Sequence, residues 1–409
     1  MLKDLGADDL GAIVVRELVA RARIEPKRVD ELIFGNVAQP AHAANVARVI
    51  GLKAGLPTEL IAHTVQRNCA SGMQSLTAAA LQIQTGQAEL VMAGGTESMS
   101  QIPLLFGARL TRLFVRLARA KTIGGRLKAM AAFRPSQLKP VIALQLGLTD
   151  PVCGLNMGQT AELLAREFGI SRQEQDAFAL ASHQKAVDAA RHGRLAPEIV
   201  GVVTPPDYTH VQLEDDGPRP EQSREALEKL RPYFDRQAGS ITAGNACPVS
   251  DGAVALLLAS ERTAHRLGCE PLGYLTGWAY AALDGSRMGL GPVYATARLL
   301  DRSGLKLKDF DLVELNEAFA AQVLANERAF ASKSFAREHL GRDKAVGELD
   351  PERLNVNGGA IALGHAVGAT GARLVLTLLH ELRRRNQRRG LATLCIGGGQ
   401  GAAIALEAA

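Results

Sequence analysis

Three side chains that could form covalent bonds or move protons stand in short turns of this chain. Cys69 follows an apolar run over 60–65 and precedes a helical pattern over 73–84, so it lies where a predicted strand turns into a helix. Unpaired N–H groups and the macrodipole at a helix N-terminus favour a thiolate and lower its pKa. We therefore expect Cys69 to be a nucleophile, although a buried structural cysteine is the ordinary alternative.

The other two side chains are His365, within the string 355–371, and Cys395, within the string 395–401; both strings are rich in glycine. Glycine allows a ligand or another backbone to approach closely, and a histidine with a purely structural role does not need such a setting. An imidazole titrates near neutrality and can accept or donate a proton. Together with Cys69, these residues indicate covalent catalysis assisted by an acid and a base.

The same three strings, with Asn-Glu-Ala-Phe-Ala at 316–320 and Ser-Asp-Gly-Ala at 250–253, resemble the motifs of the thiolase family, the acetyl-CoA acyltransferases. The resemblance extends from about Ala7 to the last predicted strand. It implies an α/β fold of two similar βαβαβαββ halves packed in five layers (α/β/α/β/α). It also implies an inserted loop domain that holds most of the contacts to CoA.

The pattern of the chain agrees with this organisation. Strand-like and helix-like runs alternate over 30–93, which indicates βα units around a buried sheet. A weak internal repeat relates 30–36 to 311–316 and 88–95 to 391–398. The expected units are an N-terminal half at 1–101 with 241–262, a CoA-binding loop domain at 102–240 and a C-terminal half at 263–409.

The resemblance implies thiolysis of a 3-ketoacyl-CoA, or the reverse condensation. Cys69 would attack the keto carbon and keep the acyl group as a thioester, while His365 takes the thiol proton. Cys395 would protonate the departing acetyl-CoA carbanion. His365 and a water held by Asn316 would form one oxyanion hole, and the backbone N–H groups of Cys69 and Gly397 the other. Each donor of this kind lowers a barrier by roughly 3–4 kcal/mol.

The resemblance also implies contacts to the pantetheine arm and the nucleotide of CoA. The residues at matching positions are Met157, Arg219, Phe234, Ala243, Cys247, Ala318 and Phe319. A core methionine and a solvated loop arginine are the alternatives for the first two. Three positions depart from the family pattern: Asn156 replaces a frequent histidine, Ala366 a usual proline, and Cys247 a serine, which is the better donor.

Family members usually carry a strand and an Arg-Thr-Pro segment upstream of the position of Leu2, and this sequence shows neither. We therefore expect the first half to lack one strand. Backbone groups that should be paired would then be exposed, which would lower stability or solubility while leaving the reacting groups in place.

Composition limits the function classes. The 409 residues, of which 47% are hydrophobic, suit two or three linked units with a sizeable core, and a net charge of +5 does not indicate nucleic-acid binding. No apolar stretch reaches the ~18–20 residues of a membrane span, and no signal-peptide core is visible at the N-terminus. The 5 cysteines lack framework or zinc spacing, which favours a reducing compartment, the cytoplasm, and makes a zinc site unexpected. The thiolase resemblance implies no metal and no tightly bound cofactor, with CoA as a substrate.

Positive charge is concentrated between Glu97 and Asp150, where no acidic residue occurs. The basic residues there are Arg109, Arg112, Arg116, Arg119, Lys121, Arg126, Lys128, Arg134 and Lys139. Apolar residues alternate with them, so 106–139 is predicted to form a pair of basic amphipathic helices. Such a pair suits a solvated surface, contact with a membrane, docking to an acidic partner subunit or steering of an anionic substrate.

The segment 331–353 resembles the β-subunits of fatty-acid oxidation complexes. This favours a degradative 3-ketoacyl-CoA thiolase of β-oxidation, with a hydratase/dehydrogenase α-subunit as a partner and a homodimer or tetramer as the assembly. A short-chain acetoacetyl-CoA thiolase is the close alternative. A ketoacyl-synthase relative would lack Cys395 and pair its nucleophile with other residues, and a non-catalytic acyl-CoA or lipid carrier would tend to lose one of the reactive side chains.

Overall fold

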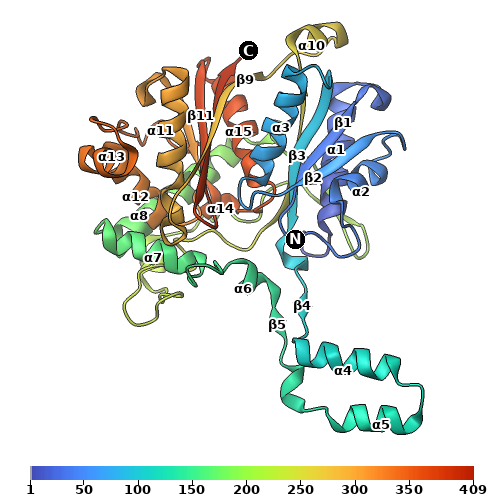
Figure 1. Ribbon diagram of the computed structural model, residues 1–409. Coiled ribbons are helices and arrows are strands. Elements are labelled where there is room, and N and C mark those ends of the chain that lie inside the picture. Colours follow the sequence, from blue (N-terminus) through green and yellow to red (C-terminus); the bar gives the residue numbers. More distant parts are fainter. Residues whose placement is uncertain (1) are drawn as a thin grey trace.

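The structure, a computed structural model, describes residues 2–409 and contains two mixed four-stranded sheets (Figure 1). The strands of the first sheet, in spatial order, are β2 (Ile61–Val65), β1 (Glu31–Gly35), β3 (Leu90–Ser98) and β8 (Asp251–Ala259). Strand β1 is parallel to β2 and β3, whereas β8 is antiparallel to β3. The helices of this half are α1 (Ala7–Ala22), α2 (Val46–Lys53), α3 (Ser71–Gln84) and α10 (Glu261–Leu267).

The second sheet has a related arrangement, with one parallel and two antiparallel pairings. Its strands, in spatial order, are β10 (Leu312–Leu315), β11 (Arg389–Ile396), β12 (Gln400–Ala408) and β9 (Gly273–Ala282). Strand β10 is parallel to β11, and β12 is antiparallel to both β11 and β9. The helices are α11 (Gly291–Ser303), α12 (Ala320–Ala331), α13 (Lys333–Leu340), α14 (Ala360–Leu363) and α15 (Thr370–Arg384).

The two sheets enclose a central layer of helices, so the fold has five layers. Helices α3 and α15 pack against each other between the sheets, where Met73 and Leu76 share a buried cluster with Leu374 and Leu378 (Figure 1). Helices α1 and α2 cover the outer face of the first sheet, and α11 covers that of the second. The predicted α/β architecture of five layers is confirmed.

A long insertion separates β3 from β8. Its elements are β4 (Leu104–Leu105), α4 (Ala108–Arg119), α5 (Ile123–Ala131), β5 (Val141–Ile142), α6 (Ala143–Gly147), α7 (Met157–Glu167), α8 (Arg172–Arg191), β6 (Val202–Thr204), β7 (His210–Gln212) and α9 (Arg224–Glu228). Short 3-10 helices occur at Pro26–Arg28 (η1), Met99–Gln101 (η2), Pro135–Leu138 (η3), Ala196–Glu198 (η4), Gly285–Leu290 (η5) and Leu307–Asp309 (η6). The division into two halves and a loop domain at the expected boundaries stays a prediction.

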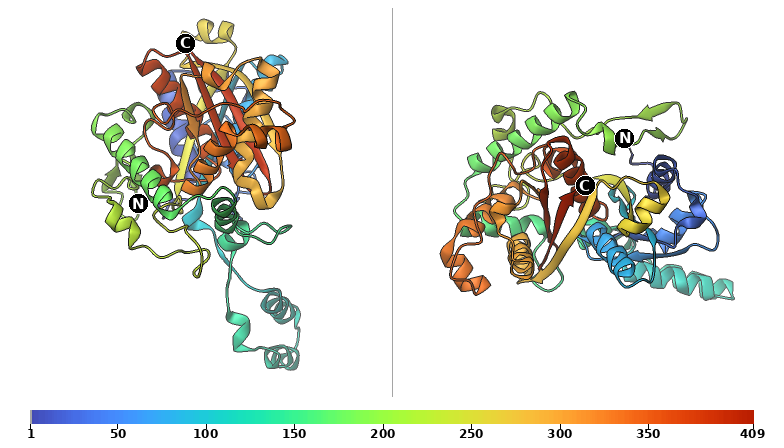
Figure 2. Two further views of the ribbon diagram at one scale, coloured as in Figure 1. Left: turned by 90° about the vertical axis from the view of Figure 1, so that its left-hand side faces the viewer. Right: turned by 90° about the horizontal axis from the view of Figure 1, so that it is seen from above.

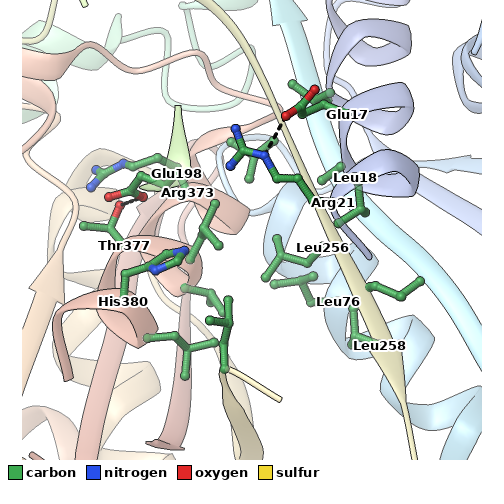
Figure 3. A pocket seen from close by; sticks show the side chains of 18 of the residues that line it. Glu17, Leu18, Arg21, Leu76, Glu198, Leu256, Leu258, Arg373, Thr377 and His380 are labelled. Atoms are coloured by element: carbon green, nitrogen blue, oxygen red, sulfur yellow. Dashed lines mark hydrogen bonds and ion pairs between the residues drawn. The ribbon is translucent and has the colours of Figure 1, made fainter. Parts of the chain in front are cut away.

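The two sheets differ at one edge. Strand β12 has β9 as its outer neighbour, whereas β8, which occupies the equivalent place, pairs only with β3 within residues 2–409. All of β8 is half-buried, while most of β12 is buried. A groove of about 1270 Å³ lies along β8, between α1 and α15. Figure 3 shows Leu256 and Leu258 of β8 facing it, with Arg21 of α1 nearby and Arg373 of α15 on the opposite wall.

This open edge yields a stability prediction. We expect a version of the chain extended upstream by about twenty residues, with an apolar strand that can pair with β8, to melt about 5 °C higher or more, since paired backbone and buried apolar surface stabilise the sheet. Thermal unfolding of the two versions tests this. An extension of equal length and polar composition is the control, and equal melting temperatures for all three proteins would refute the expectation.

Candidate active site

Cys69 lies, half-buried, in the tight turn that joins β2 to α3. Asn68 before it has a positive φ of 43°. The Ser71 hydroxyl closes the turn by donating to the Asn68 carbonyl oxygen at 2.7 Å and accepting from the Arg67 backbone N–H at 2.9 Å. The Asn68 side-chain amide donates to the Gly397 carbonyl oxygen at 2.7 Å. The turn that carries Cys69 is therefore tied directly to the glycine turn between β11 and β12.

That glycine turn brings a backbone donor to the sulfur. Cys395 is buried near the end of β11, and Gly398, with φ of 88°, allows the chain to reverse into β12. The backbone N–H groups of Gly397 and of Cys69 itself hydrogen-bond the Cys69 thiol and lower its pKa. The two N–H groups expected to form an oxyanion hole thus both face the predicted nucleophile.

Burial nevertheless has the largest influence on Cys69 and raises the pKa of its thiol above the usual value. The carboxylate of Glu97 acts in the same direction. The expectation of a lowered pKa at the start of α3 is therefore wrong for the free protein, because desolvation outweighs the two N–H donors. Cys69 rests as a thiol and needs a base when it reacts.

The raised pKa predicts how Cys69 responds to pH. Since only the thiolate is alkylated, the rate of Cys69 modification by iodoacetamide should rise about tenfold per pH unit between pH 7 and 9. Mass spectrometry of the peptide that contains Cys69 measures this rate without interference from the other thiols. If the rate instead reached its upper plateau at a pH lower than 8, the prediction would be contradicted, because the free protein would then hold Cys69 as a stable thiolate.

His365 is buried in the loop before α15, with a defined tautomer. Its Nδ1 lies 2.7 Å from the Thr370 hydroxyl, which itself donates to the Ala366 carbonyl oxygen at 3.0 Å. Nδ1 must therefore carry the hydrogen and donate to Thr370, which leaves Nε2 as the acceptor. Nε2 has no hydrogen-bond partner among residues 2–409. Burial and the charge of Arg373 lower the pKa of His365 to about 4, so the imidazole is neutral and its Nε2 can accept a proton.

Glu97, at the end of β3, fixes the loop that carries His365. Its carboxylate accepts hydrogen bonds at 3.0 Å from the backbone N–H groups of Val37, Ala38 and Gly368. Burial raises the pKa of Glu97 to about 7 despite these donors. The His365 main chain is also held from the other side, where its N–H donates to the Ser250 hydroxyl at 3.0 Å.

These segments, distant in sequence, meet around Cys69. A Cβ on Gly72, in the first turn of α3, would lie 2.7 Å from the Ala372 backbone nitrogen and 3.1 Å from the Gly368 carbonyl oxygen, so the loop after His365 packs directly on this turn. The Asn68 side chain, bonded to the Gly397 carbonyl oxygen, holds the Cys69 turn against the end of β11 that carries Cys395. Burial, and then the negative charge that Cys69 and Cys247 would carry as thiolates, raise the pKa of the Cys395 thiol well above its usual value. The structure brings the predicted reactive residues into one region.

Asn316 lies at the end of β10 and is completely buried. Neither its side-chain oxygen nor its side-chain nitrogen has a hydrogen-bond partner among residues 2–409. A buried amide in this state calls for a water or a ligand. By contrast, both carboxylate oxygens of the adjacent Glu317 have hydrogen-bond partners: they accept from the Ser182 hydroxyl at 2.6 Å and from the Asn355 side chain at 2.9 Å. Burial raises the pKa of Glu317.

Several expected CoA contacts adjoin this region. The Met157 sulfur would lie 3.2 Å from a Cβ on Gly397, so it is next to the glycine turn. The ring of Phe234 meets that of Phe319 edge-on at 5.9 Å between centroids. The Cys247 backbone N–H donates to the carbonyl oxygen of Ala318 at 3.1 Å, and burial raises the pKa of the Cys247 thiol to about 12.

Two other expected CoA contacts are exposed. Arg219 and Ala243 are exposed in loops, and no hydrogen bond or ion pair in the described part of the chain joins them to the Cys69 turn. The Arg219 backbone N–H donates to His183 Nδ1 at 3.3 Å. Asn156, where the resemblance implies a frequent histidine, caps α7: its side chain accepts from the Gln159 N–H at 2.9 Å. The departure at this position therefore has a local structural role.

Glu97 and Thr370, which position His365, are residues that sequence reasoning did not single out. An acidic residue after the apolar and glycine run 90–95 is a visible signal for Glu97, but its four hydrogen bonds are not. Residues 2–409 contain no group of three or more His, Cys, Asp or Glu side chains arranged to hold a metal ion. Within the same range, none of the helices combines the length and apolar character that crossing a bilayer requires.

Family profiles match nearly the whole chain. The profile described as "Thiolase, N-terminal domain" matches residues 1–262, and "Thiolase, C-terminal domain" matches residues 269–408. A 3-ketoacyl-CoA thiolase of Yersinia enterocolitica is 45% identical over 402 residues, which cover 98% of this chain and 91% of the relative. A 3-ketoacyl-CoA thiolase of Yersinia pestis shows the same identity and coverage.

Solved structures are also similar to this chain over its whole length. The acetyl-CoA acetyltransferase of Bacillus anthracis is 37% identical with a TM-score of 0.86, over 100% of this chain and 94% of that one. Human mitochondrial 3-ketoacyl-CoA thiolase, solved alone and in complex with CoA, is 37% identical with a TM-score of 0.85 and the same coverage.

Proposed function

The chain belongs to the thiolase family of acyltransferases, and we propose that it cleaves 3-ketoacyl-CoA with free CoA into acetyl-CoA and a shortened acyl-CoA, through an acyl-enzyme on Cys69. The observation that carries the proposal is geometric: the turn with Cys69 is hydrogen-bonded at 2.7 Å to the Gly397 carbonyl oxygen in the turn after Cys395, and the loop after His365 packs on Gly72 in the first turn of α3. Fatty-acid β-oxidation is the process that such a reaction serves.

In the first half-reaction, His365 Nε2 takes the Cys69 proton as the sulfur attacks the keto carbon. The N–H groups of Cys69 and Gly397 stabilise the oxyanion of the tetrahedral intermediate. The bond between the α and keto carbons then breaks, which leaves the acyl group on Cys69. Cys395 gives its proton to the departing acetyl-CoA carbanion, whose thioester oxygen is stabilised by His365 and by a water on Asn316.

In the second half-reaction, free CoA replaces acetyl-CoA. The Cys395 thiolate takes the thiol proton of CoA, and the CoA sulfur attacks the thioester on Cys69. The tetrahedral intermediate uses the same two backbone N–H groups. Cys69 leaves and recovers its proton from the His365 imidazolium, so both thiols and the imidazole return to their resting forms. The reaction uses no metal and no bound cofactor.

The remaining expectations are part of the same proposal. Met157, Phe234, Ala318, Phe319 and Cys247 would line the pantetheine channel; their grouping next to the glycine turn supports this. The same proposal includes CoA contacts by Arg219 and Ala243, which lie on exposed loops. A cytoplasmic homodimer or tetramer fits the five unpaired cysteines and the assemblies usual in this family.

The acyl chain length is tested by comparing thiolysis of acetoacetyl-CoA and 3-ketohexadecanoyl-CoA, with Cys69→Ala as the control. The degradative assignment predicts a higher kcat/KM for the long substrate, because the relatives at 45% identity are 3-ketoacyl-CoA thiolases. A preference for acetoacetyl-CoA would support the alternative, an acetyl-CoA acetyltransferase such as the Bacillus anthracis relative. Residual activity in Cys69→Ala equal to that of the parent protein would refute the covalent mechanism. Absence of thiolysis by the parent protein with both substrates would favour a non-catalytic carrier.

A further inference from the structure

The two backbone N–H groups that face the Cys69 sulfur come from different halves of the fold. Cys69 lies between β2 and α3 of the first half, whereas Gly397 lies in the turn between β11 and β12 of the second. Figures 1 and 2 show the two halves side by side, the first mainly in blue and the second in orange and red. The donors of an oxyanion hole must be held within about 0.5 Å of their required positions. The two turns therefore need a fixed relative position.

Arg67 is built into the Cys69 turn through its main chain. Its backbone N–H donates to the Ser71 hydroxyl at 2.9 Å, and its carbonyl oxygen accepts from the Ala70 N–H at 3.0 Å. The half-buried Arg67 side chain then leaves the turn and contacts α3, β9 and β12. Whatever holds the guanidinium group therefore also holds the turn that carries the predicted nucleophile.

The Arg67 guanidinium joins the two halves. Its Nε donates to the Gln74 side-chain oxygen at 2.7 Å, and its Nη1 donates to the Gln400 side-chain oxygen at 3.2 Å. Its central carbon lies 4.2 Å from the centroid of the Tyr280 ring, within the range of a cation–π interaction. The Tyr280 hydroxyl lies 2.7 Å from the Thr77 hydroxyl. Gln74 and Thr77 belong to α3 of the first half, and Gln400 and Tyr280 to the second sheet.

Gln400 lies where it can orient the glycine turn. It is paired with Ile396 across the start of the β11–β12 hairpin, so these two residues enclose the turn that contains Gly397. The Asn68 side-chain amide holds the Gly397 carbonyl oxygen at 2.7 Å. One hydrogen bond alone would let the two turns rotate about it, whereas the second one, from Arg67 to Gln400, fixes their relative orientation.

We propose that Arg67 is a positioning residue for the oxyanion hole, which fixes the Cys69 turn against the glycine turn and thereby aligns the two backbone N–H groups. Arg67 acts in the acylation of Cys69, so this role rests on the proposed function. Its Nε and Nη1 reach two acceptors at once while the planar group lies over Tyr280. A lysine keeps the charge but has a single ammonium group and no planar face, so it cannot replace these three contacts.

Acyl-enzyme formation on Cys69 and steady-state thiolysis, both with 3-ketoacyl-CoA, test this role. Loss of one oxyanion donor lowers kcat about 10²- to 10³-fold, so a misaligned donor should lower it about 10- to 100-fold. We expect this loss in Arg67→Lys and in Gln400→Ala, with KM nearly unchanged, because the aligned donors act on the transition state. Gln74→Ala breaks a contact within the first half only and should lower kcat much less.

Arg298→Lys is the matched control, because this exposed arginine also bonds β9, at the Tyr280 carbonyl oxygen (3.1 Å), and it should keep the parent kcat. Combining Arg67→Lys with Gln400→Ala should lower kcat no further than Arg67→Lys alone, since both changes remove the same link. Thermal unfolding shows whether each variant is folded. If Arg67→Lys is not, the comparison of Gln400→Ala with Gln74→Ala decides.

Acylation of Cys69 at the parent rate in folded Arg67→Lys would overturn the inference. Equal losses of kcat in Gln74→Ala and Gln400→Ala would overturn it as well, because Arg67 would then only stabilise the fold. A parent protein that forms no acyl-enzyme on Cys69 would overturn the proposed function itself, and the role of Arg67 with it.

Discussion

Changing Cys69 to alanine should lower kcat for thiolysis by about 10⁴-fold or more, because removal of a nucleophile also makes the groups that assist it useless. His365 Nε2 would have no thiol to deprotonate, and the N–H groups of Cys69 and Gly397 would face a methyl group. The fold should be preserved, since alanine fits the space of the side chain and the turn is held by Ser71 and Asn68.

The measurement is steady-state thiolysis of 3-ketoacyl-CoA, with thermal unfolding as the test of folding. Cys269→Ala is the matched control, because it removes another half-buried thiol, in the segment that follows α10. Activity of Cys69→Ala within tenfold of the parent protein would contradict the assigned role.

Changing Cys395 to alanine should have the second largest effect, about a 10³-fold loss in kcat, within the range usual for a general acid or base. The acetyl-CoA carbanion would then lack its proton donor, and CoA would lack its base. Acyl exchange between a saturated acyl-CoA and Cys69 forms no carbanion, and the thiol of CoA can also lose its proton to water, so this partial reaction should be slowed much less than thiolysis. A larger loss of thiolysis than of acyl exchange is therefore the result expected if Cys395 transfers a proton to the carbanion.

Cys395→Ser keeps a side chain of similar size to cysteine. It should be nearly as inactive as Cys395→Ala, because the pKa of a hydroxyl is far above that of a thiol. The exchange of labelled CoA into acyl-CoA measures the partial reaction. If Cys395→Ala lost exchange and thiolysis to the same extent, the residue would be supporting the site rather than transferring a proton.

Local patterns in the sequence predicted the elements well. The apolar run before Cys69 and the helical spacing after it correspond to β2 and α3, and the thin internal repeat relates strands at equivalent places, β1 to β10 and β3 to β11. The basic stretch forms the predicted pair of helices, α4 and α5. Such features depend on residues that are close to one another in the sequence, so they can be recognised in a single sequence.

Burial from distant segments could not be predicted in the same way. The pKa of Cys69 is raised because other segments exclude water from it, and the start of α3 gives no sign of them. Likewise, the tautomer of His365 depends on Thr370, and its loop depends on Glu97, 271 residues away. Proton positions and pKa values follow from packing of the whole fold, so they required the structure.

The most direct test of the account is mass spectrometry of the intact protein after incubation with 3-ketoacyl-CoA in the absence of free CoA, followed by peptide mapping. The account predicts one acyl group on the peptide that contains Cys69, its removal when CoA is added, and no adduct in Cys69→Ala. An acyl group on a different residue, or turnover without any adduct that free CoA can discharge, would contradict it.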